Sequence, residues 1–190
     1  MEATATHIAR HGYAEMVLER VASDAGCTRG ALYHVFANKT ELTLAAVEWA
    51  YGAWRDDVGY LFVGGAGDDP VETLIAVARG SAVYTRRGDV ARICSRLIAD
   101  FEGVDHPVGR MVRKIAAHVL DDTTRLITAG QKAGVIPSGE PPRELALAFH
   151  ATIAGVLRAF AGQRPYDMLF AERAALGVLA LPPTSETGNA

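Results

Sequence analysis

The sequence predicts an all-α protein in which a small three-helix unit precedes a larger helical body. Apolar residues recur at helical spacing along most of the chain, glycine and proline clusters interrupt this spacing, and capping residues stand at several of the interruptions. A chain of 190 residues can form one sizeable core or two small ones, and 49% hydrophobic with 22% charged residues is an ordinary globular composition.

Residues 17–40 have the spacing of a helix-turn-helix. The first short helix carries one apolar stripe, formed by Leu18, Val21, Ala22 and Ala25. Gly26 should end this helix, because glycine reaches positive φ without steric cost and lets the chain turn sharply. Thr28 can cap the second helix, which is predicted to run to about residue 35 or 36. Its inward-facing residues are predicted to be Ala31, Leu32 and Val35.

The outward face of the second helix is the candidate DNA-reading surface. Its residues are Thr28, Arg29, Gly30, Tyr33 and His34. Polar and aromatic side chains on a short helix, with a glycine that allows close approach, suit a DNA major groove. Asn38 and Glu41 then have the spacing of a capping box and predict a third helix that begins at residue 39 or 40. The amino end of that helix and Lys39 would lie where a phosphate could bind.

This part of the chain closely resembles the amino-terminal domain of TetR/AcrR-type transcriptional regulators. The resemblance covers roughly the first quarter of the sequence and rests on residues 12–13, 21–22, 25–26, 30–36, Lys39 and Leu42. It implies a DNA-binding domain over residues 1–46, with Thr28, Arg29, Gly30, Tyr33, His34 and Lys39 as its DNA contacts. Residues 47–190 would then form a helical domain for effector binding and dimerisation.

Several features depart from the family pattern. The first helix, predicted over residues 2–11, is short and lacks the basic residues that usually precede it, unless the true start lies upstream. Met16 and Val17 stand where the family commonly has threonines that cap the second helix and contact a phosphate. Residues 1–46 hold four basic and five acidic side chains, a formal charge of −1. Because phosphate neutralisation contributes much of DNA affinity, we expect modest binding that falls with salt.

The remaining residues predict a helical body. Residues 40–62 should form one long helix. In relatives, this helix transmits the effect of ligand binding to the spacing of the two DNA-binding domains. The glycine-rich residues 64–70 predict a linker loop. Further helices are predicted over residues 70–85, 90–101, 108–133, 144–160 and 166–181.

The last two predicted helices alternate small and large apolar residues, a pattern that favours close packing with a second copy as a four-helix interface. The candidate interface residues are Ala148, Thr152, Gly155, Val156, Phe170 and Leu176. Burial within one subunit is the alternative for part of this set.

The family resemblance also implies a small, largely apolar effector in the middle of the body. Aromatic or polar-tipped residues on otherwise aliphatic helices are the candidates for its pocket: Trp54, Tyr84, Cys94, Phe101, His118, Phe149 and His150. A place in the core is the alternative for each of them. Apart from Asp121 and Asp122 after His118, no carboxylate or histidine stands at ligand spacing from His118 or His150. No nucleophile, base and orienting group form a set, so we expect no metal, no cofactor and no catalysis.

Together, these expectations predict a homodimer that binds a near-palindromic operator, with two recognition helices about 34–36 Å apart. In this family, repression that is relieved by a bound ligand is the commoner mode of regulation. The alternative is a dimeric helical small-molecule-binding protein whose operator binding is vestigial. The amino end is unlike a signal sequence, no run approaches the ~20 apolar residues of a membrane helix, and Cys27 and Cys94 are far apart, so we expect a cytoplasmic protein with no membrane partner.

Overall fold

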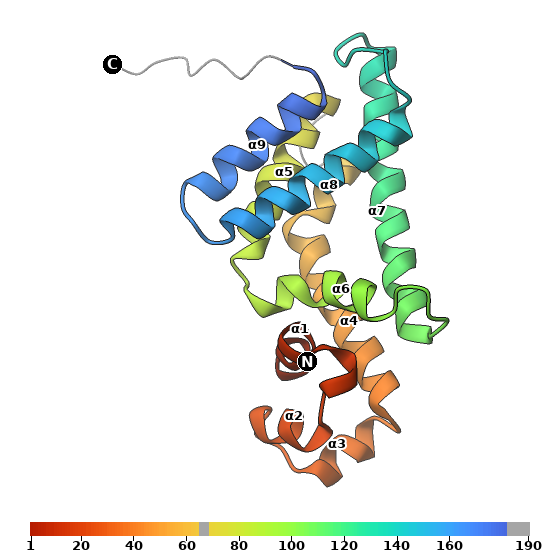
Figure 1. The fold of residues 1–190 in the computed structure, drawn as a ribbon, viewed down its shortest axis with the longest axis vertical. Helices are drawn as coiled ribbons and strands as arrows, with labels where there is room; N and C mark the ends of the chain where they lie inside the picture. The colour runs from red at the N-terminus through yellow and green to blue at the C-terminus, as the bar shows by residue number, and fades with distance from the viewer. Residues whose placement is uncertain (65–68, 182–190) are drawn as a thin grey trace. The chain divides into compact units, whose positions relative to one another are not determined.

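A computed structural model describes residues 1–64 and 69–181 of the chain, and every regular element in these ranges is helical (Figure 1). The elements are α1 (Glu2–Glu15), α2 (Leu18–Asp24), α3 (Arg29–Val35), α4 (Lys39–Asp57), the 3₁₀ helix η1 (Gly59–Val63), α5 (Pro70–Thr85), α6 (Asp89–Asp100), α7 (Pro107–Lys132), α8 (Pro142–Phe160) and α9 (Tyr166–Val178). The predicted all-α class is confirmed.

Most helix ends lie close to their predicted positions, and the largest difference concerns the long fourth helix. We predicted it over residues 40–62, but α4 ends at Asp57 and the chain continues as η1. The predicted break at Gly12 is present as a kink within α1, where Gly12 has φ 84° and ψ 171°. The predicted linker loop falls largely on residues 65–68, which lie outside the described residues.

Two compact units make up the chain, and each combines segments that are distant in sequence. The first contains Met1–Asp57 and Arg87–Ala117, and the second contains Val58–Arg86 and His118–Ala190. The first unit therefore includes α6 and the beginning of α7, although we placed everything after residue 46 in the second domain. The functional division at residue 46 remains a prediction.

The core of the first unit joins α1, α2 and α4 to α6. Ile8, Leu42 and Ile93 are fully or almost fully buried in one cluster that also contains Leu97 and Phe101. α6 packs extensively against α1 and also contacts α4. α6 is thus a structural part of the unit that carries the helix-turn-helix.

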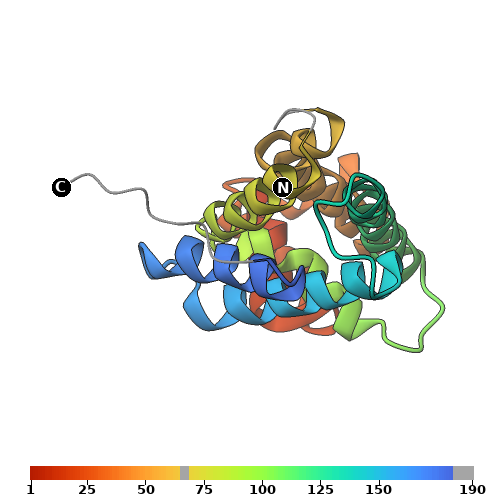
Figure 2. The same ribbon diagram turned by 90° about the horizontal axis from the view of Figure 1, so that it is seen from above.

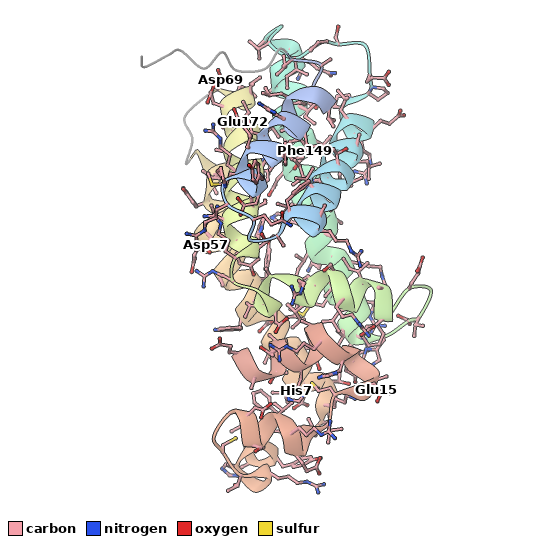
Figure 3. All side chains as sticks on the ribbon, turned by 60° about the vertical axis from the view of Figure 1, so that its left-hand side comes forward. His7, Glu15, Asp57, Asp69, Phe149 and Glu172 are labelled. Carbon is pink, nitrogen blue, oxygen red and sulfur yellow. The ribbon has the colours of Figure 1, made fainter. Side chains whose placement is uncertain are left out.

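In the second unit, α9 packs against both α5 and α8 (Figure 2). Two ion pairs reinforce the contact between α5 and α9. Arg86 donates to both carboxylate oxygens of the fully buried Asp167, at 2.9 and 3.0 Å. Arg79 Nε donates at 2.8 Å to Glu172, which is labelled in Figure 3. The hydrogen bonds from Arg86 hold the pKa of Asp167 below its ordinary value, against the opposing effect of burial.

The described helices include none that is both long enough and apolar enough to cross a membrane.

Candidate nucleic-acid interface

The turn between α2 and α3 has the predicted geometry. Gly26 has φ 67°, and the N–H of Cys27 donates to the carbonyl of Ala22 at 2.9 Å, which closes the end of α2. The N–H of Ala31 donates to Thr28 Oγ1 at 3.1 Å, so Thr28 caps α3. These local bonds satisfy backbone groups that helix ends leave unpaired, and they set the direction in which α3 leaves the turn.

α3 is more exposed than we predicted. Leu32 is its buried residue, whereas Ala31 is exposed and Val35 is 67% exposed, so their predicted inward orientation is wrong. A helix of seven residues at the edge of a unit presents a narrow inner face, and Phe36, just after the helix, supplies a second apolar contact with the core. Nearly the whole of α3 is therefore open to a partner.

The candidate contact residues on α3 all lie on this open surface. Thr28, Arg29, Gly30, Tyr33 and His34 are exposed. The Arg29 guanidinium lies 5.2 Å from the centre of the Tyr33 ring, and its Nη1 is 2.7 Å from Glu19 Oε1 on α2. The Thr28 hydroxyl accepts the capping bond and keeps its own proton for donation to a phosphate oxygen.

The Lys39 ammonium group already has a hydrogen-bond partner within the protein, which the sequence did not indicate. Its Nζ donates to the carbonyl of Ala14 at 2.9 Å and lies 4.7 Å from the centre of the Tyr13 ring, so Lys39 ties the beginning of α4 to the end of α1. Burial lowers the pKa of Lys39, while the charge of Glu15 opposes that shift. Two ammonium N–H groups beyond the Ala14 bond remain for a phosphate.

The predicted capping box at the start of α4 is present with one altered partner. The N–H of Glu41 donates to Asn38 Oδ1 at 2.9 Å, as predicted. Glu41 Oε2 accepts in return from the N–H of Ala37, at 3.0 Å, rather than from that of Asn38. Two backbone donors at the entry to α4 are thus satisfied by side chains.

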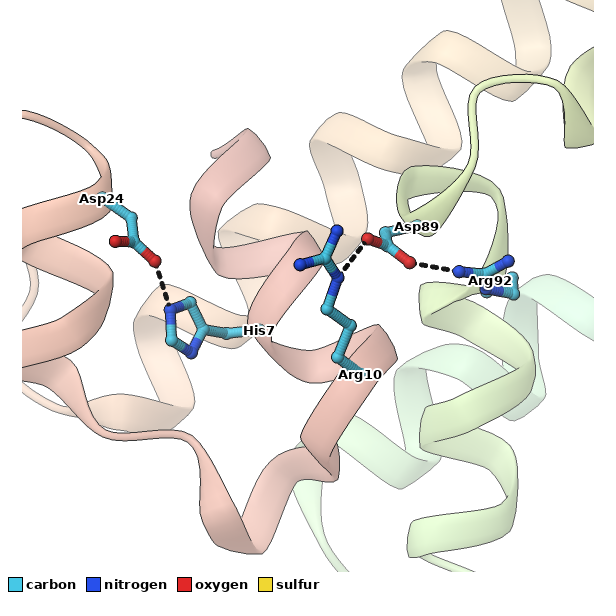
Figure 4. A network of polar contacts seen from close by, with 5 residues as sticks. All are labelled: His7, Arg10, Asp24, Asp89 and Arg92. Carbon is cyan, nitrogen blue, oxygen red and sulfur yellow. Dashed lines mark hydrogen bonds and ion pairs between the residues drawn. The ribbon is translucent and has the colours of Figure 1, made fainter.

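Two side-chain contacts that fix α1 were not apparent from the sequence (Figure 4). His7 Nε2 lies 2.7 Å from Asp24 Oδ2 at the end of α2. Arg10 Nε donates to Asp89 Oδ2 at 2.6 Å, and Asp89 also pairs with Arg92. The partners in the first two pairs are 17 and 79 residues apart, so no local spacing could have indicated them.

Residues 1–46 match the family model described as bacterial regulatory proteins, tetR family. The chain carries a TetR-family domain. This TetR-family domain coincides with the segment on which the resemblance was based, and the recognition from the sequence is confirmed.

Solved structures with the same fold span nearly the whole chain. The structure of AibR in complex with isovaleryl coenzyme A and operator DNA has a TM-score of 0.79 at 18% identity, covering 95% of this chain and 96% of that one. The TetR-family transcriptional regulator PfmR from Thermus thermophilus gives 0.75 at 16% identity, with the same coverage. The SmeT–triclosan complex gives 0.71 at 23% identity, covering 100% of this chain and 96% of that one. Curated proteins yielded no match.

The absence of threonine at the start of α2 in this TetR-family domain has visible consequences. Val17 occupies the capping position and makes no side-chain cap bond. Met16 is 3% exposed and belongs to the core cluster. The two positions therefore contribute packing and an apolar surface in place of a cap.

The predicted effector-pocket residues divide between the two units. In the unit that contains the TetR-family domain, Phe101 stacks on His106 at 4.4 Å within the core, and burial raises the pKa of the Cys94 thiol to about 11. Trp54 stacks on Tyr51 at 5.7 Å. For Phe101 and Cys94 a place in the core accounts for the position, because both pack against its apolar cluster.

In the second unit, His118 is exposed and lies 3.7 Å from Asp122, so the structure does not place this pocket candidate among the buried residues. Tyr84 and Phe149 are buried. His150 Nε2 lies 2.8 Å from Thr123 Oγ1, and burial lowers the pKa of the His150 imidazole. Phe149 and His150 are in edge-to-face contact at 5.6 Å, so the structure places these two pocket candidates together.

The predicted interface residues on α8 are mostly available to a second copy. Ala148, Thr152 and Gly155 are exposed, and Val156 is partly buried. On α9, Phe170 is partly buried against Phe160 and Tyr166, whereas Leu176 is 4% exposed. We remove Leu176 from the candidate interface, because a side chain buried in its own subunit offers no surface to a partner.

Proposed function

We propose that this protein is a sequence-specific, DNA-binding transcriptional regulator that acts as a homodimer, most simply as a repressor released from its operator by a ligand. One observation carries the proposal. α3 is held at the edge of its unit by the Gly26 turn and the Thr28 cap, and almost every side chain that it bears is open to a partner.

The chemistry of this open surface suits a DNA groove. Arg29 can donate to guanine acceptors, while Tyr33, His34 and the Thr28 hydroxyl can donate to phosphate oxygens. Gly30 has no side chain, and the nearest atom to a Cβ built there is Thr28 Oγ1 at 3.9 Å, so the backbone of α3 can approach the DNA closely. Lys39 adds a cation at the amino end of α4, where the helix dipole also favours an anion.

The charge of the first 46 residues sets the expected character of binding. Residues 1–46 contain four basic and five acidic side chains, and Arg29 itself is paired with Glu19. The general attraction to phosphates is therefore weak, and specific contacts must carry a large share of the affinity. We expect modest binding whose affinity falls as ionic strength rises.

A second copy would bring two α3 helices to successive major grooves of a near-palindromic operator. The exposed small residues of α8, namely Ala148, Thr152 and Gly155, support a dimer built on this helix, since small residues let helices of two copies approach closely. The exposed Leu147 extends the apolar part of the same helix surface.

An effector that binds one arrangement of the body more tightly would shift the dimer away from the DNA-bound spacing. The ligand complexes of the solved structures, isovaleryl coenzyme A with AibR and triclosan with SmeT, support a ligand-responsive body of this fold. His150 and Phe149 are the described residues that we propose to contact a small, largely apolar effector. The neutral imidazole of His150 would supply its polar contact.

The alternative is a dimeric small-molecule-binding protein in which operator binding is vestigial. The acidic balance of residues 1–46 and the uncapped start of α2 favour it. The two functions differ in one observable, the selection of DNA sequence.

The test is selection from a pool of DNA duplexes with a randomised core of about three helical turns, carried out with the full chain at low and at moderate salt. The regulator should enrich a two-fold related motif whose half-sites are separated by about one helical turn. Arg125→Ala, at an exposed arginine of the second unit, is the control and should enrich the same motif. A pool that stays random at both salt concentrations would favour the alternative.

Release is then tested on the selected duplex with isovaleryl coenzyme A and triclosan as probes. A fall in DNA affinity that saturates with either probe supports a ligand-relieved repressor. A rise in affinity would instead favour a regulator that requires its ligand.

A further inference from the structure

Glu19 on α2 and Arg29 on α3 form an ion pair across the helix-turn-helix. Glu19 Oε1 lies 2.7 Å from Arg29 Nη1, and the guanidinium carbon lies 5.2 Å from the centre of the Tyr33 ring, one turn further along α3. Arg29 is therefore held on two sides, by a carboxylate from the neighbouring helix and by an aromatic ring of its own helix.

These two contacts leave part of the guanidinium open. They use Nη1 and one face of the plane, and in the described part of the chain the N–H groups on Nη2 and Nε have no other partner. The Arg29 side chain is 61% exposed and that of Glu19 is 49% exposed, so the pair lies at the surface. An arginine that is anchored at one corner can still offer two parallel donors to the acceptors of a guanine edge.

We infer that Glu19 is a positioning residue that determines sequence specificity by holding Arg29 in its reading orientation. The inference rests on the proposed function. A free arginine side chain samples many rotamers and loses them on binding, whereas a side chain already held in one direction loses fewer. Glu19 thereby increases the preference for the base pair that Arg29 reads, while its own negative charge weakens attraction to any DNA.

Two other roles for Glu19 lead to different results. Glu19 stands in the first turn of α2, where a negative charge stabilises the helix, and that role alone would leave base preference unchanged. A competitive role, in which Glu19 merely occupies Arg29 until DNA displaces it, would make binding tighter and base preference stronger once Glu19 is neutralised. Positioning is the role that predicts weaker preference together with tighter general binding.

The experiment uses Glu19→Gln, which keeps the shape of the side chain and removes its charge. Its controls are Arg29→Ala, the double variant, and Glu48→Gln, which removes the same charge from an exposed residue of α4 in the same unit. Dissociation constants are measured by fluorescence anisotropy on the duplex selected from the randomised pool. They are also measured on duplexes altered at the base pair where Arg29→Ala relaxes the preference, and on one unselected duplex.

We expect Glu19→Gln to reduce the preference at that base pair about two- to fivefold, which is the bias that an exposed ion pair can supply. Affinity for the unselected duplex should rise, because a negative charge near the phosphates has been removed. The double variant should show the preference of Arg29→Ala alone. Glu48→Gln should keep the wild-type preference.

Unchanged or stronger preference in Glu19→Gln, in a protein whose Arg29→Ala variant has relaxed preference, would overturn the positioning role and leave the proposed function standing. The same change of preference in Glu48→Gln would also overturn it, because the effect would then come from net charge. If the wild-type chain enriches no sequence at all, the proposed function fails, and the inference fails with it.

Discussion

The backbone N–H of Tyr13 donates a 2.6 Å hydrogen bond to Oδ2 of Asp100, the last residue of α6. The other carboxylate oxygen accepts from Arg96 Nε at 2.9 Å, and Arg96 Nη2 donates to the carbonyl of His11 at 3.3 Å. Both backbone groups flank Gly12, where the helical bonding of α1 is interrupted. α6 thus supplies the hydrogen bonds that the kink removes.

Gly12→Ala is expected to lower the free energy of unfolding by about 1–3 kcal/mol. Gly12 has φ 84° and ψ 171°, a region that only glycine adopts readily, and an added Cβ would lie 2.9 Å from Asp100 Oδ2 and closer still to the Arg96 guanidinium. Urea unfolding followed by circular dichroism measures the change. Gly52→Ala is the control: it lies in α4 with open space around it, so the variant should be neutral or more stable.

Asp167→Asn should lower the free energy of unfolding at pH 7 by more than the loss of an exposed ion pair does. The change leaves the charge of Arg86 without its partner at a position where Asp167 is fully buried. The control is Asp121→Asn, which removes one partner of the exposed pair with Arg143 and should change the unfolding free energy by less than about 1 kcal/mol. If both variants lost the same unfolding free energy, the expectation that the Arg86–Asp167 pair stabilises the fold more than an exposed pair would be refuted.

The Arg86–Asp167 pair also predicts that the free energy of unfolding decreases at acidic pH. Arg86, chiefly through its hydrogen bonds, keeps the pKa of folded Asp167 below the unfolded value, so the stabilisation is complete above about pH 4 and decreases as the carboxylate protonates below it. The difference in unfolding free energy between wild type and Asp167→Asn should therefore shrink between about pH 4 and pH 2. A constant difference over this range would contradict the assignment.

His150 predicts a second and higher window of pH dependence. Burial lowers the pKa of the folded imidazole, so the unfolded chain binds a proton first as pH falls below about 6.5, and folding stability decreases from there down to the folded pKa. His150→Gln preserves a donor near Thr123 and has no titration. Thermal unfolding between about pH 7 and pH 5 should show a decrease in wild type that is smaller in the variant.

Arg29→Ala should weaken binding to the selected duplex by about 1–3 kcal/mol and relax the preference at one base pair of each half-site. The exposed guanidinium at the amino end of α3 is the group lost. Arg125→Ala measures the effect of charge alone and should leave that preference intact. A uniform loss of affinity on every sequence would reassign Arg29 to a phosphate contact.

If the proposed α8 interface forms, Gly155→Arg should convert the proposed dimer to a monomer in sedimentation velocity experiments. Gly155 is exposed on α8 with nothing within 4 Å of a built Cβ, so one subunit can accommodate the arginine while a partner packed there cannot. Gly139→Arg, at an exposed glycine before α8, is the matched control. If both variants sediment as wild type does, the proposed α8 interface is wrong.

Much of the first unit could be read from the sequence because its signals are local. Gly26 and Thr28 act on residues within four positions of themselves, and Asn38 and Glu41 act across a single helical turn. The predicted faces were less accurate. Helical periodicity places Val35 on the same face of α3 as Leu32. It does not show how much of that face the neighbouring helices cover.

The sequence by itself determined the helical class, the helix-turn-helix and the resemblance to the TetR family, because these depend on residue types at short and regular spacings. Only the tertiary structure decided that α6 supports α1 through Asp100 and Arg96, that Arg86 pairs with Asp167, and that Glu19 holds Arg29. The first two relationships join residues about 80 or more positions apart, and the third depends on the angle between two helices. Such contacts are set by how helices pack, which local spacing does not specify.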